Sequence, residues 1–166
     1  MFVIHRSSNS NTVCYKGREK KGGAGQPDLH VYWIMFSSAD KHTEELTALE
    51  RNTAYGTKLT PNADGSLLVQ LSALKEKHII VRKRPATKQR QHSASGQQWE
   101  WEARTEIGGK KNAVLLAIHV EMAKSFIPSV AYIEIFGKDG AYELIEKVSG
   151  SGAEKLRKRR ELQAAS

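Results

Sequence analysis

Polar and hydrophobic residues alternate along most of the chain with a period of two, which is the pattern of β-strands that bury one face. The alternation is clearest at Ser66–Leu71, where aliphatic residues occupy every second position. Two longer runs, His30–Phe36 and Asn112–Met122, are apolar on both faces, which predicts strands covered on both sides. The other predicted strands are Phe2–Arg6, Thr12–Tyr15, His78–Arg82, Trp99–Glu102, Val130–Phe136 and Ala141–Val148.

One internal segment, Thr43–Asn52, predicts an α-helix instead. Capping side chains at Ser37–Asp40 precede it, acidic residues lie near its start, and good helix formers fill it. Gly56 can adopt the positive φ that ends a helix. We therefore expect Tyr55 at a corner, with its ring packed and its hydroxyl directed toward a pocket.

Turn residues separate the predicted strands. Ser7–Asn11 predicts a five-residue polar loop, because each of its side chains can bond to nearby backbone. Gly137–Gly140 predicts a hairpin turn, and Lys75–Lys77 a short connection. About nine short antiparallel strands with one inserted helix indicate a mainly β fold, either a closed barrel or a two-sheet sandwich.

The chain has 166 residues, of which 39% are hydrophobic, enough for one core and short for two. We expect a single β-rich domain at residues 1–148, followed at 149–166 by a flexible linker and a basic helical tail. Cys14 is the only cysteine, so it has no internal disulfide partner. No signal peptide or membrane-spanning run is recognisable, which predicts a cytoplasmic protein that is not transmembrane.

The formal charge of +8 favours partners that are anionic. Two basic segments could contact the phosphates of a nucleic acid such as RNA, with Trp99 or Trp101 available to stack on bases. The basic residues of these segments are Arg82, Lys83, Arg84, Lys88 and Arg90 in an exposed loop, and Lys155, Arg157, Lys158, Arg159 and Arg160 in the tail.

Arg6 stands at the mouth of the predicted polar loop. A guanidinium presents a planar fork of donors that suits a carboxylate or a phosphate, so this position is a candidate anion site. The expected ligand is an anionic small molecule or an acidic lipid head group.

An enzyme would have to use His5 or His30 as a base beside Arg6 and Glu50. No nucleophile elbow, metalloprotease, paired-cysteine or phosphate-loop motif is recognisable, and we predict no cofactor and no metal. Glu100 and Glu102 alternate with two tryptophans. We expect these carboxylates on an exposed strand face, where they keep the surface hydrated.

Several short motifs together resemble a known family. They are an R-x-x-N-x-N-x-V-x-Y start, a Y-W-I strand and an A-Y-G helix end, with Leu49-Glu50 and Ala131-Tyr-Ile133 in the same order. The chain from about residue 2 to 147 is similar to an uncharacterised, mainly bacterial domain of unknown function. The resemblance implies a single compact domain and carries no established activity. The positions that match the motifs are Arg6, Asn9, Asn11, Tyr15, Trp33, Glu50 and Tyr55.

These observations favour a non-enzymatic binding module, in which the motif residues surround a concave site. Arginine and amide groups would bind the anionic part of a ligand, and the aromatic rings would contact its apolar or planar part. Nucleic-acid binding, an enzyme of unknown class and a role in protein interaction remain the alternatives.

Overall fold

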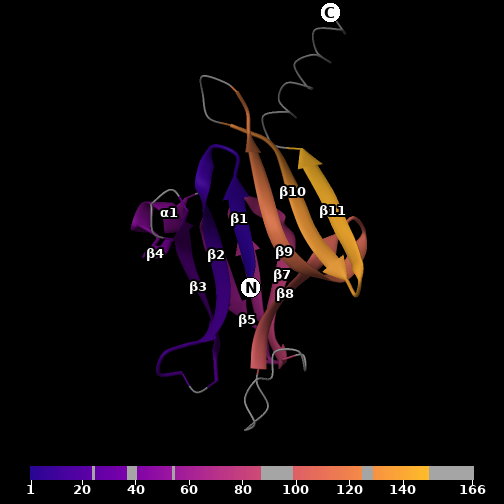
Figure 1. Cartoon of the computed structure of the whole chain (residues 1–166). Coiled ribbons are helices and arrows are strands. Elements are labelled where there is room, and N and C mark those ends of the chain that lie inside the picture. Colours follow the sequence, from indigo (N-terminus) through magenta and orange to yellow (C-terminus); the bar gives the residue numbers. More distant parts are fainter. Residues whose placement is uncertain (24, 37–40, 54, 87–98, 125–128, 150–166) are drawn as a thin grey trace, which may run out of the picture.

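The computed structural model describes residues 1–23, 25–36, 41–53, 55–86, 99–124 and 129–149, which form eleven strands and one short helix (Figure 1). The strands of the first half are β1 (Phe2–Arg6), β2 (Asn9–Glu19), β3 (Pro27–Met35), β4 (His42–Glu45), β5 (Thr57–Pro61) and β6 (Leu67–Leu71). The strands of the second half are β7 (Leu74–Pro85), β8 (Trp99–Ile107), β9 (Lys110–Met122), β10 (Val130–Asp139) and β11 (Tyr142–Ser149). The helix α1 spans Ala48–Asn52.

The strands form one branched sheet, with β9 at the branch point. Along one path the order is β4-β3-β2-β1-β9-β8-β7-β6-β5, while β10 pairs with β9 and β11 pairs with β10. The first part of β9 pairs with β8, and residues 117–120 pair with β1. Because β9 changes partner along its length, the sheet divides into two layers. In Figure 1, β1, β2, β9, β10 and β11 lie in front, and β5 and β7 lie behind them.

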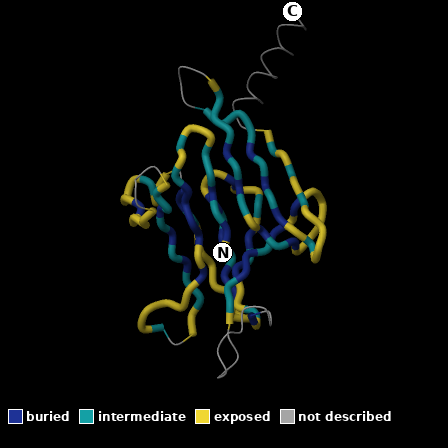
Figure 2. The backbone as a smooth tube through the Cα atoms, viewed as in Figure 1, coloured by how far each residue is buried: buried dark blue, intermediate teal, exposed yellow. Residues whose placement is uncertain are grey.

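The core lies between these layers. Buried and less buried positions alternate in β6 and in much of β3 and β9, and the buried positions follow the middle of the strands (Figure 2). The largest fully buried side chains are Tyr15, Phe2, Leu67, Ile79, Ile107 and Leu115. The prediction of a mainly β fold is confirmed. Of its two forms the sandwich fits, because the end strands β4 and β5 do not pair with each other among the described residues, so the sheet is not closed.

The expectation that all strands are antiparallel is wrong at one place. Strand β1 runs parallel to β9, with Val3 opposite Ala117 and Arg6 opposite Val120, whereas the other pairings of the described strands are antiparallel. A parallel pair requires a long crossover, and here the whole chain from β2 to β8 provides it.

The predicted helix at 43–52 is also wrong over its first half. Residues His42–Glu45 form β4 and pair with the edge of β3, which satisfies backbone groups of β3 that would otherwise be open. The helix begins only after Thr47, whose side chain accepts from the Glu50 amide while the Glu50 carboxylate accepts from the Thr47 amide.

Three predicted turns are shorter than expected. The loop at 7–11 reduces to Ser7 and Ser8, because Asn9–Asn11 already belongs to β2 across an irregular pair. Residues 75–77 lie within β7, and residues 137–139 within β10. Gly137 and Lys138 pair with both β9 and β11, so strand pairing overrides the local turn preference there.

The predicted linker and tail lie outside the described residues from position 150 onward, including Lys155, Arg157, Lys158, Arg159 and Arg160. Part of the predicted basic loop, with Lys88 and Arg90, also lies outside them. Arg82, Lys83 and Arg84 are not in a loop, because β7 continues through Pro85.

Candidate functional site

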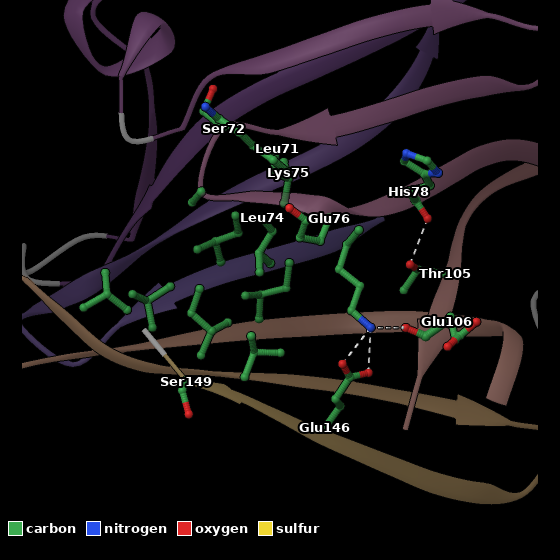
Figure 3. Close-up of a pocket in the computed structure, with 18 of the residues that line it drawn as sticks. Leu71, Ser72, Leu74, Lys75, Glu76, His78, Thr105, Glu106, Glu146 and Ser149 are labelled. Atoms are coloured by element: carbon green, nitrogen blue, oxygen red, sulfur yellow. Dashed lines mark hydrogen bonds and ion pairs between the residues drawn. The ribbon is translucent and has the colours of Figure 1, made fainter. Parts of the chain in front are cut away.

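A cavity of about 870 Å³ lies between the two layers. One wall of the cavity is formed by β1, β9, β10 and β11. The β6–β7 hairpin forms the facing wall, to which it contributes Leu71, Ser72 and Leu74 (Figure 3). The aliphatic residues Ile4, Ile118, Val120, Ile133, Val130 and Val148 line the first wall. The volume is that of a site for a small organic molecule.

Arg6 is the only one of the seven motif residues that lines this cavity. Side chains alternate along β1, so Phe2, Ile4 and Arg6 point toward the inside. The Arg6 Nε atom is buried and has no hydrogen-bond partner among the residues that the structure describes. Among the described residues no carboxylate forms an ion pair with Arg6.

An aromatic cluster supports the Arg6 guanidinium from one side. The Arg6 Cζ atom lies 4.7 Å from the centre of the Tyr55 ring, and Trp33 meets the same ring edge-on at 5.1 Å between centroids. The Tyr15 hydroxyl donates to the Tyr55 carbonyl at 3.2 Å. Burial raises the pKa of Tyr55, while the Arg6 charge acts in the opposite direction. The cluster holds the guanidinium in place by cation–π contact without neutralising it.

The other three motif residues have partners away from the cavity. The Glu50 carboxylate accepts from the Trp33 indole at 3.1 Å and from the amide and hydroxyl of Thr47 at 2.8 Å each. Burial acts to raise the pKa of Glu50, but these hydrogen bonds outweigh it and lower the pKa. Asn9 accepts from the Asn11 amide, and Asn11 accepts from the Phe36 amide. These contacts give all three a structural role in the helix cap and in the start of β2.

The far side of the cavity holds an ion pair that the sequence did not indicate. The Lys77 Nζ atom lies 2.7 Å from the Glu146 carboxylate and donates to the Glu106 carbonyl at 3.0 Å, as the dashed lines in Figure 3 mark. The Gly108 amide also donates to Glu146, at 2.8 Å. Burial acts to raise the pKa of Glu146, but Lys77 and the Gly108 amide lower it below its usual range. The only available signal was that Glu146 is two residues from Leu144 and from Val148, which places it on the same face of β11 as these aliphatic side chains.

The residues of the enzyme alternative do not converge. His5 points away from the cavity, because it is next to Arg6 in a strand, and it stacks on His119 with 3.2 Å between the Nδ1 atoms. His30 pairs with Glu45 at 2.7 Å. With Glu50 engaged in the helix cap, no base and acid meet at Arg6 within the described residues.

The described basic residues of the predicted nucleic-acid surface are paired with carboxylates. Arg84 lies 2.6 Å from Glu100 and 3.1 Å from Glu102, and Lys83 pairs with Glu19. The expectation that both carboxylates are exposed is wrong, since Glu102 is only 5% exposed. Arginine side chains on β7 and β8 cover it.

Within the part of the chain that the structure describes, no three histidine, cysteine or acidic side chains are grouped as metal ligands would be. The same residues include no helix with the length and apolar content to cross a membrane.

Comparison with known proteins gives one result. No curated protein and no solved structure matches the chain. The family model of DUF4833, a domain of unknown function, matches residues 2–147, which are all of the described strands except the last two residues of β11. The chain therefore belongs to the family of the domain of unknown function DUF4833.

Proposed function

We propose that this domain is a non-enzymatic binding module that takes an anionic small molecule in the cavity beside Arg6. The observation that carries the proposal is the Arg6 guanidinium, which forms no ion pair with a described residue and whose buried Nε donor has no hydrogen-bond partner among those residues. A buried donor without a partner costs about 1–3 kcal/mol of stability, so the fold bears a cost that a bound anion would remove.

The surroundings of Arg6 support an anion as the missing partner. A guanidinium keeps its positive charge at any physiological pH and makes its strongest hydrogen bonds with carboxylates and phosphates. The Tyr55 ring covers one face of the guanidinium, which leaves its edge for a ligand. The cavity volume of about 870 Å³ leaves room for more than an inorganic ion.

Thermal unfolding with benzoate and acetate as probe anions tests the proposal. Ligand at 100 times its Kd adds about 2.7 kcal/mol to the free energy of unfolding, so benzoate should raise the Tm of the unaltered protein. Arg6→Gln should lose this increase and, without ligand, should unfold at no lower temperature than the unaltered protein.

Arg18→Gln is the matched control, because Arg18 forms an exposed ion pair with Asp28 at 2.8 Å and does not line the cavity. It should keep the response to benzoate. A response that persists in Arg6→Gln, or that is missing in the unaltered protein, would overturn the proposal. Loss of the folded state in Arg6→Gln would instead show that the arginine is structural.

A further inference from the structure

Arg6 stands at one end of a row of cavity-lining residues that crosses four strands. In the register of the sheet, Arg6 is opposite Val120, Val120 is opposite Ile133, and Ile133 is opposite Val148. All four line the cavity. Three spacings between strands make the row about 14 Å long, with one cation followed by three aliphatic side chains.

The neighbouring row ends in a carboxylate. Ile4 is opposite Ile118, Ile118 opposite Ile135, and Ile135 opposite Glu146. Glu146 is neutralised by Lys77, and Lys77 is also bonded to the Glu106 carbonyl. The far end of the cavity is therefore polar but already satisfied, whereas the cation at the near end has no ion-pair partner within the described part of the chain.

From this arrangement we infer that the ligand is a single-chain amphipathic carboxylate. Its head group binds Arg6, and its aliphatic body lies across β9, β10 and β11 against Val120, Ile133 and Val148. This inference rests on the proposed function and adds the class of ligand and its direction. One unpaired guanidinium matches one negative charge, and the aliphatic row matches a chain without polar groups.

A third cation, Lys75, lines the cavity from the β6–β7 hairpin, in addition to Arg6 and the paired Lys77. Lys75 is exposed, so water solvates its ammonium group and an anion gains little by replacing that water. We therefore place the head group at Arg6 rather than at Lys75. The variant Lys75→Gln is the control for the loss of a positive charge that lines the cavity.

Isothermal titration calorimetry with hexanoate, octanoate, decanoate and dodecanoate, below their micelle concentrations, tests the aliphatic part. Burial of each added methylene should tighten binding by about fourfold, and the gain should stop once the chain spans the row of about 14 Å. Octanol, which lacks the charge, should bind roughly ten- to a hundredfold more weakly than octanoate.

Variants separate the two ends of the ligand. Arg6→Gln should weaken octanoate to the level of octanol, whereas Lys75→Gln should change its affinity less than threefold, which is about the effect of an exposed charge. Val148→Phe, which fills the row, should weaken decanoate at least tenfold, while Ile145→Phe on the exposed face of the same strand should not.

The outcomes distinguish this inference from the proposed function. Binding of acetate and hexanoate through Arg6 with no gain from longer chains would overturn the inference and leave the proposed function standing. Absence of binding by every anion would overturn both. Equal affinity for octanoate and octanol, or loss of octanoate binding in Lys75→Gln but not in Arg6→Gln, would overturn the assignment of the head group.

Discussion

Substitution of Glu102 by glutamine should lower the stability of the domain more than any other single loss of charge among the described ion pairs. The Glu102 carboxylate accepts from the Arg104 Nε atom at 2.5 Å, lies 3.1 Å from the Arg84 Nε atom and 3.6 Å from Arg82. Its side chain is 4% exposed, so these three guanidiniums, rather than water, solvate it. Glu102→Gln keeps the size of the side chain and removes the charge.

The magnitude follows from the unequal burial of the partners. Removing one member of a buried ion pair costs about 3–5 kcal/mol, mainly because the remaining charge is left without a partner. Here the remaining arginine side chains are 22% to 46% exposed and recover part of their solvation from water. We therefore expect a loss of about 2–3 kcal/mol, or a Tm lower by about 4–12 °C for a domain of this size.

The pH dependence has a definite sign. Burial acts to raise the pKa of Glu102, but the hydrogen bond from Arg104 and the charges of Arg104, Arg84 and Arg82 outweigh it and lower the pKa below 4.5. A carboxyl group whose pKa is lower in the folded state stabilises the fold above its unfolded pKa. This contribution is lost as the pH falls from 4.5 through the lowered value, so the difference between the unaltered protein and Glu102→Gln should shrink in that range.

Urea unfolding at pH 7 and at intervals below pH 5 measures both quantities. Glu19→Gln is the matched control, because it makes the same chemical change in an exposed pair with Lys83 and should cost less than about 1 kcal/mol. Equal midpoints for the two variants at pH 7 would refute the claim that burial makes the Glu102 cluster stabilising. A difference that stays constant down to pH 3 would refute the ionic origin of the effect.

Three further substitutions test the packing. Gly137→Ala should destabilise the domain by about 3 kcal/mol or more in urea unfolding, because a Cβ there would overlap Ile107 and a backbone carbonyl; a midpoint near that of the unaltered protein would contradict this. Tyr15→Phe should cost about 1–2 kcal/mol by the same measurement, since the buried Tyr55 carbonyl loses its donor, and no change would show that water replaces it. Thr47→Ala should lower the free energy of unfolding by about 1 kcal/mol and reduce the helical circular dichroism signal, because the capping box is lost. No change in either quantity would show that packing alone holds the short helix.

The sequence indicated the strands where local pattern and tertiary structure agree. The alternation at β6 corresponds to a strand with one buried face. The apolar run in β3 is also a strand, but the expectation that it is covered on both faces is wrong, because only the face of Leu29, Val31 and Trp33 is buried. The pattern failed at β4, whose four residues are all exposed and so carry no alternation of buried and exposed positions. The parallel pair of β1 with β9 was also beyond the sequence, because residues more than a hundred positions apart meet there and no local signal records which strands become neighbours.

The candidate site was predictable only in part, for a similar reason. Strand alternation and the turn residues pointed to Arg6 as a side chain at the edge of a pocket, but they did not show that the pocket wall comes from β9, β10 and β11. Asn9 and Asn11 looked like ligand groups, yet both accept from backbone amides close to the turn. Polar residues near a turn serve backbone hydrogen bonding and ligand binding equally well, so composition does not separate these roles.

Two groups of arginines in this domain show how the structure distinguishes a charge that is compensated within the fold from one that is open to a ligand. Arg82, Arg84 and Arg104 surround one buried carboxylate, so their charges are compensated within the fold. Arg6 has an aromatic ring against one face and, unlike these three, forms no ion pair with any described carboxylate, while Ile4, Ile118 and Val120 line the cavity beside it. A fold under selection for stability alone would gain from replacing such an arginine by an apolar residue of similar length. This contrast is the physical basis for our proposal that a ligand provides the negative charge that Arg6 lacks among the described residues.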